Sequence, residues 1–156
     1  MALHVVTDKP DAPEAPVDIL NRRRIAAAPA AVFAAFAPQK LARWWGPEGF
    51  RSTFDVFEFR TGGRWTFTMH GPDGAAYPNQ NTFAEVREPS LVVVRHEGLP
   101  HGFTLRIDLQ ADGDGTLVGW RQRFDTVEER NRVEPMCRGF NEQNLDRLQA
   151  MVAEGA

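Results

Sequence analysis

The side chains that could carry catalysis or hold a metal ion are few and scattered in this sequence. Its four histidines are His4, His70, His96 and His101, and no two are spaced as His-x-His or His-x-x-x-His. Together with the single cysteine, Cys137, they form no metal-ligand pattern. The chain also has no Gly-x-Ser-x-Gly nucleophile motif. The spacing therefore predicts no metal site, no cofactor and no catalytic residue.

A polar site around His96 stays open as an alternative, because distant residues can converge on folding. Glu97 follows His96 directly, and Tyr77 and Arg121 are the other side chains that an enzymatic site would draw on. The simpler interpretation is that His96 ends a strand and His101 caps a loop, since isolated histidines usually serve hydrogen bonding. The sequence favours a protein without enzymatic activity.

Three of the four tryptophans lie in a segment that is rich in turn signals. Glycine allows the positive φ that tight turns require, and tryptophan is rarely left exposed. We therefore expect a rim where turns meet a core or a pocket, with Trp44 and Trp45 either plugging the core or lining the pocket mouth. The motifs are Trp44-Trp45-Gly46-Pro47, Gly62-Gly63-Arg64-Trp65 and Gly71-Pro72-Asp73-Gly74.

Hydrophobic periodicity predicts the elements that position these residues. A strand over Val17–Ala26 precedes two short helices, Pro29–Ala37 and Gln39–Trp45. Beyond Phe50 the apolar period becomes two, as in half-buried strands. Short connections such as Asp112–Gly115 make consecutive strands antiparallel. The strands are expected near Thr53–Arg60, Arg64–His70, Thr82–Arg87, Leu91–Glu97, Phe103–Gln110 and Thr116–Phe124.

After Asp125 the pattern becomes helical again. Thr126–Glu129 has the form of a capping box, and Pro135 is expected to restart a helix that reaches Glu154, about 30 Å at ~1.5 Å per residue. The apolar stripe of this helix is broken only by Asn144. Such a helix is the natural cover for the apolar face of a six- or seven-stranded sheet, which predicts an α+β fold.

Composition limits the class of protein. The 156 residues carry a net charge of −3, which does not suit a nucleic-acid-binding surface, and no apolar run is long enough to insert into a membrane. A single cysteine suits a reducing compartment, and we expect a cytoplasmic protein. Residues 1–16 are expected to be a flexible leader and residues 17–154 one domain, acting as a monomer or homodimer.

An ordered set of short motifs resembles a known family across roughly Asp18 to Val152. The chain is similar to the START-like (SRPBCC, birch-pollen-allergen-like) superfamily, in the branch of homologues of the activator of the heat-shock-protein-90 ATPase. The resemblance implies a helix-grip fold, a curved antiparallel sheet wrapped around a long C-terminal helix. The motifs are Pro29–Phe36, Leu41–Phe50, Gly62–Trp65, Met69, Gly71–Gly74, Tyr77-Pro78, Glu85-Val86, Glu88-Pro89 and Leu145–Leu148. The family usually has Gly-Trp where this chain has Gly139-Phe140.

Three functions follow from the residues and the resemblance. The first is binding of a small apolar molecule in a cavity between the sheet and the C-terminal helix, where methionine and aromatic side chains suit an adaptable site. The second is an enzyme of the polyketide-cyclase or dehydratase kind. The third is a stress-related or co-chaperone-like interaction through an exposed Trp44–Trp45 rim. The expected ligand-binding residues are Trp44, Trp45, Trp65, Phe67, Met69, Tyr77, His96, Phe103, Leu105, Met136 and Phe140.

Overall fold

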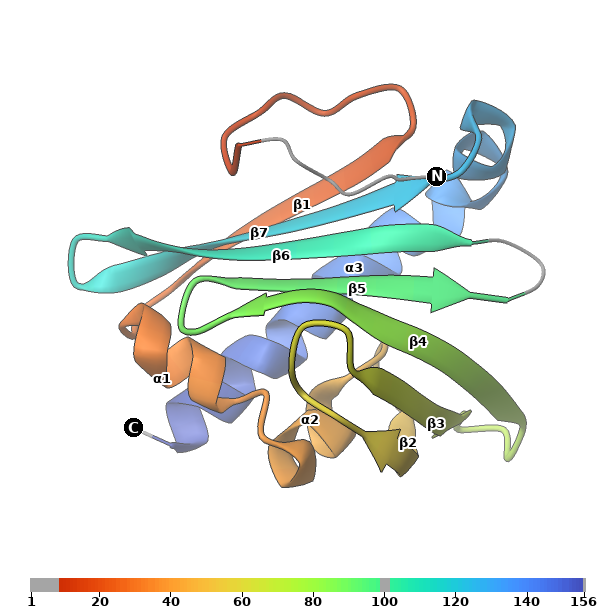
Figure 1. Ribbon diagram of the computed structural model, residues 1–156, viewed down its shortest axis with the longest axis horizontal. Coiled ribbons are helices and arrows are strands. Elements are labelled where there is room, and N and C mark those ends of the chain that lie inside the picture. Colours follow the sequence, from red (N-terminus) through yellow and green to blue (C-terminus); the bar gives the residue numbers. More distant parts are fainter. Residues whose placement is uncertain (1–8, 99–101, 156) are drawn as a thin grey trace.

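A computed structural model describes residues 9–98 and 102–155 (Figure 1). His4 and His101 therefore lie outside the described residues. In chain order the elements are β1 (Asp18–Ile25), α1 (Pro29–Ala34), α2 (Pro38–Trp44), β2 (Arg51–Phe57), β3 (Arg64–His70), β4 (Ala76–Arg87), β5 (Leu91–Glu97), β6 (Phe103–Asp112), β7 (Gly115–Phe124) and α3 (Val127–Glu154).

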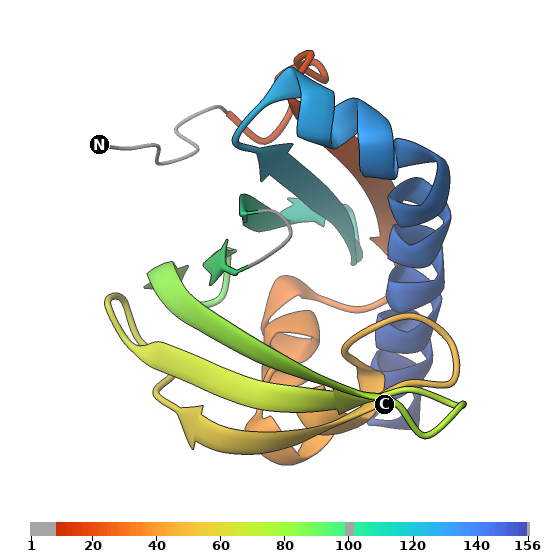
Figure 2. The ribbon, with the colours of Figure 1, turned by 90° about the vertical axis from the view of Figure 1, so that its right-hand side faces the viewer.

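The strands form one curved antiparallel sheet in the order β1-β7-β6-β5-β4-β3-β2. The long helix α3 runs along the concave side of this sheet, where it packs against β1 and β7 (Figure 2). The short helices α1 and α2 lie beside the second half of α3. This arrangement confirms the predicted α+β helix-grip fold, with seven strands and two short helices after the first strand.

Two strands differ from their sequence-based bounds for identifiable reasons. The alternation of β2 is broken by a register shift between Phe54 and Val56, so no single period fits its sequence. The strand β4 begins at Ala76 instead of Thr82, because its first half is polar and gives no apolar alternation. Pro78 is tolerated there because β5 pairs with β4 only from Gln80 onward, so this part of β4 has one neighbour.

Large aromatic side chains form a substantial part of the core between the sheet and the helices. Trp44, Trp65, Trp120, Phe36 and Phe83 are almost fully buried. The Trp65 and Phe83 rings stack with centroids 5.3 Å apart. Such pairs add to the stabilisation that apolar burial supplies. Tryptophans from the turn-rich segment, Trp44 and Trp65, therefore belong to the same core as Phe83 of β4.

The helix α3 is continuous from Val127, so Pro135 lies inside it and does not restart it. The Thr126 side chain caps its first turn by accepting a hydrogen bond from the Glu129 N–H at 3.1 Å. Proline removes one helical hydrogen bond, to the carbonyl of Asn131, but Asn131 is exposed to water. This exposure explains why the helix continues through Pro135.

We expect Gly139→Ala to raise the free energy of unfolding by about 0.5–1 kcal/mol, because alanine favours a helix interior over glycine. A Cβ at Gly139 would meet no other atom within 4 Å, so the methyl group adds no clash. Urea denaturation followed by circular dichroism measures the change. Gly63→Ala is the contrasting control, since its Cβ would lie 1.9 Å from the Glu58 carbonyl oxygen. A less stable Gly139→Ala variant would contradict this prediction.

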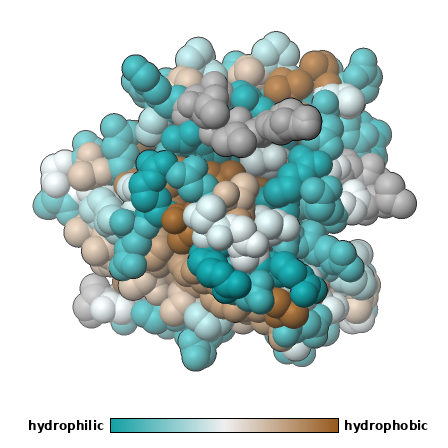
Figure 3. Space-filling model, in the orientation of Figure 1, coloured by the Kyte–Doolittle hydropathy of each residue, from teal (hydrophilic) through white to brown (hydrophobic). Residues whose placement is uncertain are grey.

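The segment that precedes β1 packs on the convex side of the sheet. Arg121 donates hydrogen bonds to the carbonyl oxygens of Pro13, at 3.1 Å, and Ala12. Figure 3 views the molecule from the side opposite α3 and shows mainly hydrophilic residues around a smaller hydrophobic area. The flexibility of residues 1–16 stays a prediction.

Candidate functional site

A row of side chains crosses the concave face near the end of the sheet where β5 and β7 finish. Phe103 on β6, His96 on β5, Asn81 on β4 and Trp65 on β3 are successive cross-strand partners. We call these four residues the inner row. Cross-strand partners share one face of a sheet, so all four side chains project toward the helix side. The row therefore places polar groups between aromatic ones.

Hydrogen bonds determine which nitrogen of His96 carries a proton. Asn81 donates its Nδ2–H to the carbonyl oxygen of Trp65 at 3.2 Å, which orients the amide. Its Oδ1 then lies 2.9 Å from Nδ1 of His96, so Nδ1 must be the donor. The neutral imidazole therefore keeps its lone pair on Nε2. The His96 ring also stacks on Phe103, with centroids 4.8 Å apart.

One edge of α3 borders this end of the concave face. Met136, Phe140, Gln143 and Arg147 follow one another at helical spacing and share that edge. Gln143 accepts a hydrogen bond from the Glu48 N–H at 3.0 Å, so the edge adjoins the loop between α2 and β2. Met136 and Phe140 are 54% and 38% exposed. The helix thus presents two large apolar side chains to solvent here.

This exposure differs from the sequence-based expectation that Met136 and Phe140 pack between sheet and helix. The first half of α3 is held to the sheet by a different side chain, Val133, which packs with Ile19 and Phe124. That contact turns the edge with Met136 and Phe140 away from β1 and β7. Because α1 and α2 lie beside the other half of α3, they do not cover it (Figure 2).

The paired tryptophans have separate roles. Trp44 is 1% exposed and donates its Nε1–H to the Ala35 carbonyl oxygen at 2.8 Å, so it is a core residue. Trp45 is half-buried on the concave side, with its ring centroid 4.9 Å from that of Trp65 and 5.5 Å from that of Trp120. Trp44 therefore offers no surface to a partner protein, whereas Trp45 lies beside the inner row.

The remaining expected site residues divide between core, rim and surface. Phe67 and Leu105 are buried core residues. Met69 is half-buried against the α2–β2 loop, where its Cε approaches Gly46. Tyr77 is 46% exposed and its ring contacts that of Phe50. Only part of the expected set therefore reaches the inner row.

The residues of the enzymatic alternative do not converge. Arg121 projects from the convex face and binds Asp18 at 2.7 Å, whereas His96 projects from the concave face. Glu97 follows His96 in the same strand, so alternation turns it to the opposite side, where it pairs with Arg95 at 3.0 Å. Of His96, Glu97, Tyr77 and Arg121, the inner row includes only His96.

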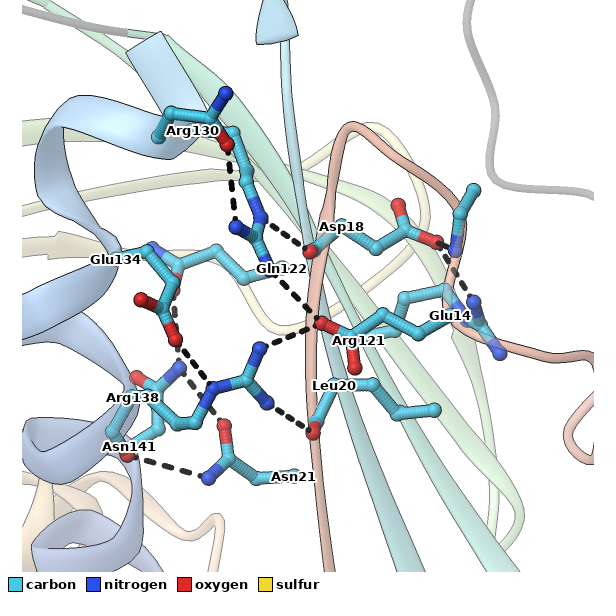
Figure 4. Close-up of polar contacts among 12 residues, drawn as sticks. Glu14, Asp18, Leu20, Asn21, Arg121, Gln122, Arg130, Glu134, Arg138 and Asn141 are labelled. Atoms are coloured by element: carbon cyan, nitrogen blue, oxygen red, sulfur yellow. Dashed lines mark hydrogen bonds and ion pairs between the residues drawn. The ribbon is translucent and has the colours of Figure 1, made fainter. Parts of the chain in front are cut away.

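Sequence reasoning missed three amide side chains that link α3 to the sheet (Figure 4). Asn21 of β1 donates to the Arg138 carbonyl at 3.2 Å and to Glu142 Oε2 at 2.7 Å. Asn141 of α3 donates to Asn21 Oδ1 at 3.2 Å and to Gln122 Oε1 at 3.0 Å. We call Asn21, Asn141 and Gln122 the amide chain. The sequence did contain one indication, because Gln122 is an amide residue at a position of β7 that alternation turns inward, between Trp120 and Phe124.

Asn144 and Arg147 attach the α2–β2 loop to α3. Asn144 is 6% exposed, donates to the Trp44 carbonyl at 2.9 Å and accepts from the Gly46 N–H at 3.1 Å. Arg147 donates to the Gly46, Pro47 and Phe50 carbonyls at 2.9, 2.8 and 2.7 Å. Burial lowers the pKa of Arg147 from its ordinary value, and Glu48 opposes this effect. These contacts hold Trp45 in place beside the inner row.

Other reactive groups do not form a second site. Burial raises the pKa of Cys137, which disfavours the thiolate that a nucleophile needs. No cluster of three His, Cys, Asp or Glu side chains in residues 9–98 and 102–155 could hold a metal ion. A pocket of about 130 Å³ between α1, α2 and the end of α3 is lined by Ala31, Lys40 and Met151 among others, and is small for a ligand site.

The fold and its partly exposed concave face define a START-like, helix-grip protein. The chain belongs to the family of Activator of Hsp90 ATPase homolog 1-like proteins, which it matches over residues 26–153. This assignment confirms the resemblance that the short motifs carried. No curated protein matches the chain significantly. In the described residues, no helix has both the length and the apolar character that crossing a membrane requires.

Solved structures of similar proteins support the same fold. A protein from Nitrosomonas europaea is 22% identical with a TM-score of 0.82, and the match covers 91% of this chain and 97% of that one. A protein from Arthrobacter aurescens is 20% identical with a TM-score of 0.83, covering 89% and 87%. The AHSA1 protein from Silicibacter pomeroyi is 23% identical with a TM-score of 0.71, covering 89% and 99%. At these identities the likeness concerns the fold alone.

Proposed function

We propose that this protein binds a small, largely apolar molecule on its concave face, between the inner row and the α3 edge that carries Met136 and Phe140. The observation that supports the proposal is the exposure of these two side chains, at 54% and 38%, beside a half-buried aromatic surface. Contiguous exposed apolar groups commonly mark a binding site. Trp45 and Phe103 supply further half-buried rings on the sheet side.

Nile red, an uncharged dye that fluoresces in apolar surroundings, tests this proposal. Phe140→Ser is expected to weaken dye binding about tenfold, because the loss of an aromatic contact costs about 1.5 kcal/mol or more. Fluorescence titration of the wild-type protein and the variant measures the dissociation constants. Circular dichroism verifies that the variant is folded.

Val127→Ser is the matched control, since Val127 is an apolar residue of α3 that is 37% exposed but begins the helix, more than two turns before Met136. This variant should bind Nile red like the wild type. Equal losses in the two variants would indicate nonspecific adsorption, and no dye binding by the wild type would reject the proposal. Native mass spectrometry of the purified protein would reveal a co-purified ligand.

An enzymatic reaction and contact with a chaperone receive less support from the geometry. The polar residues that a reaction would need lie on opposite faces of the sheet, and Trp44 is buried. Homodimer formation, contact with a chaperone and a cytoplasmic location stay predictions.

A further inference from the structure

The amide chain determines how Gln122 is oriented. The Arg138 carbonyl and the Glu142 carboxylate accept hydrogen bonds, so Asn21 must direct its Nδ2 toward them. Asn21 Oδ1 then accepts from Asn141, which leaves Asn141 Nδ2 to donate also to Gln122 Oε1. Reversing any of these amides would place donors against donors or acceptors against acceptors. The chain therefore fixes Oε1 of Gln122 toward α3 and Nε2 away from Asn141.

The Nε2 group of Gln122 makes no hydrogen bond to any described residue, although Gln122 is only 7% exposed. Among the described residues the fully buried side-chain atoms without a partner are Ser52 Oγ and Trp65 Nε1, so Nε2 of Gln122 keeps contact with solvent and can be reached by a bound molecule. Phe103 of the inner row pairs with Phe124, two residues along β7 from Gln122, so this donor lies next to the inner row on the concave face. A bound molecule could supply the missing acceptor.

Gln122 has two buried, apolar cross-strand partners, Ile19 and Leu105. The charged groups of α3 beside the amide chain are already paired, Glu142 with Arg23 at 3.1 Å and Arg138 with Glu134 at 2.7 Å. The β1 arginine that faces α3, Arg23, is already engaged by Glu142, Asp146 and Gln149. The arginines of β5, β6 and β7 lie on the convex face, where they meet aspartates. A carboxylate beside Gln122 would therefore be desolvated without a cation to balance its charge.

A second donor on the concave face has no partner either. The Nε1–H of Trp65, in the inner row, is buried and makes no hydrogen bond to the described residues. Gln122 and Trp65 thus both offer hydrogen-bond donors from a largely apolar face. A neutral acceptor oxygen complements these two donors, whereas an ammonium group, which can only donate, does not.

From these contacts we infer that the ligand is an uncharged, largely apolar molecule with a carbonyl-type oxygen, and that Gln122 Nε2–H donates to this oxygen. The inference rests on the proposed function, because it concerns the ligand of the same site. It distinguishes ketones, esters and lactones from plain hydrocarbons and from fatty acids or other carboxylates.

Three naphthalene probes of closely similar shape test the inference by displacing Nile red from the full-length protein. 2-Acetylnaphthalene has the carbonyl oxygen, 2-isopropenylnaphthalene replaces it with a CH₂ group, and 2-naphthoate carries a charge. The ketone is expected to bind about five- to tenfold more tightly than the isopropenyl compound, as one hydrogen bond would give. The carboxylate should bind most weakly of the three.

Gln122→Met should reduce the affinity for the ketone about five- to tenfold and leave that for the isopropenyl compound unchanged, since methionine keeps the length but removes both donors. Gln110→Met is the matched control, because Gln110 lies exposed on the convex face of β6. Gln122→Glu, which keeps the acceptor oxygen, replaces the methionine variant if that variant does not fold. It should likewise lose its preference for the ketone.

The outcomes separate the two proposals. If none of the three probes displaces Nile red and the dye itself does not bind, the proposed function fails. If the three probes bind the wild-type protein equally, or if Gln122→Met retains the preference for the ketone, the role of Gln122 is overturned while the ligand site stands. Tightest binding of 2-naphthoate would overturn the assignment of an uncharged ligand.

Discussion

Replacement of Arg147 by methionine is expected to lower the free energy of unfolding by about 3 kcal/mol, because several charge-assisted hydrogen bonds are lost together. The guanidinium donates to the Gly46, Pro47 and Phe50 carbonyls at 2.7–2.9 Å and also to that of Arg43. Carbonyls at the end of α2 and in the loop after it would lose this partner. Urea denaturation at neutral pH measures the effect.

Arg147→Lys should recover only part of this loss, since a lysine ammonium cannot reproduce the planar fork that reaches both ends of the loop. Arg43→Met is the matched control. Arg43 is 62% exposed and its ion pair with Glu154 is 3.3 Å long, so the variant should lose less than about 0.5 kcal/mol. If Arg147→Met is as stable as Arg43→Met, the loop does not depend on this arginine.

Arg147→Met is also expected to affect the proposed ligand site, because the α2–β2 loop holds Trp45 beside it. Trp45 follows α2 directly, and its ring contacts Trp65 of the inner row. Asn144 alone would still hold the Trp44 carbonyl and the Gly46 N–H, on either side of Trp45. Gln143 would also still accept from the Glu48 N–H. The loop therefore retains these two attachments to α3, and the mobility that it gains is expected to appear first at the Trp45 side chain.

The parts of the fold that the sequence predicts well are those with one dominant period. The alternation around Trp65 and Phe67 identifies β3, and that around Leu105 and Ile107 identifies β6, because each strand buries one face only. Gly62 also behaves as predicted, with φ of +85° in the turn before β3. The local sequence is enough to predict these strands and this turn, because their structure depends on residues that are neighbours in the chain.

The polar part of the candidate site depends on contacts that no local pattern contains. Asn144 is visible in the sequence as the break in the apolar stripe of α3, but its partners, at Trp44 and Gly46, lie about a hundred residues away. Asn81 belongs to the polar half of β4, which has no apolar alternation. The orientation of the Gln122 amide depends on its hydrogen bond from Asn141 on α3. The roles of these three amide residues depend on hydrogen bonds to residues that are distant in the sequence.

The convex face holds the most buried charges that the structure describes. Asp18 is fully buried and accepts hydrogen bonds from Arg121 and Arg123, at 2.7 Å each, and from the Ala15 N–H at 3.0 Å (Figure 4). Arg121 is itself only 2% exposed. Buried charges of this kind are strongly coupled, because each depends on the other for compensation.

Asp18→Asn is expected to lower the free energy of unfolding by about 3–5 kcal/mol at neutral pH, because it leaves the Arg121 cation buried without its counterion. The asparagine nearly matches the aspartate in shape, so packing changes little. Thermal or urea denaturation measures the loss. Asp114→Asn is the matched control, since Asp114 is fully exposed in its ion pair with Arg24 and should contribute almost nothing.

The dependence of stability on pH separates a charge effect from a packing effect at Asp18. Burial alone would raise the pKa of Asp18, but hydrogen bonds from Arg123, Ala15 and Arg121 outweigh it and hold the pKa below its ordinary value of 3.8. A depressed folded-state pKa gives stability that is complete above the ordinary value and is lost as pH falls through the folded-state value. Wild-type protein should therefore lose stability below about pH 4, and Asp18→Asn should lose less over the same range. Parallel pH profiles for the two proteins would show that the aspartate charge is not what stabilises this face.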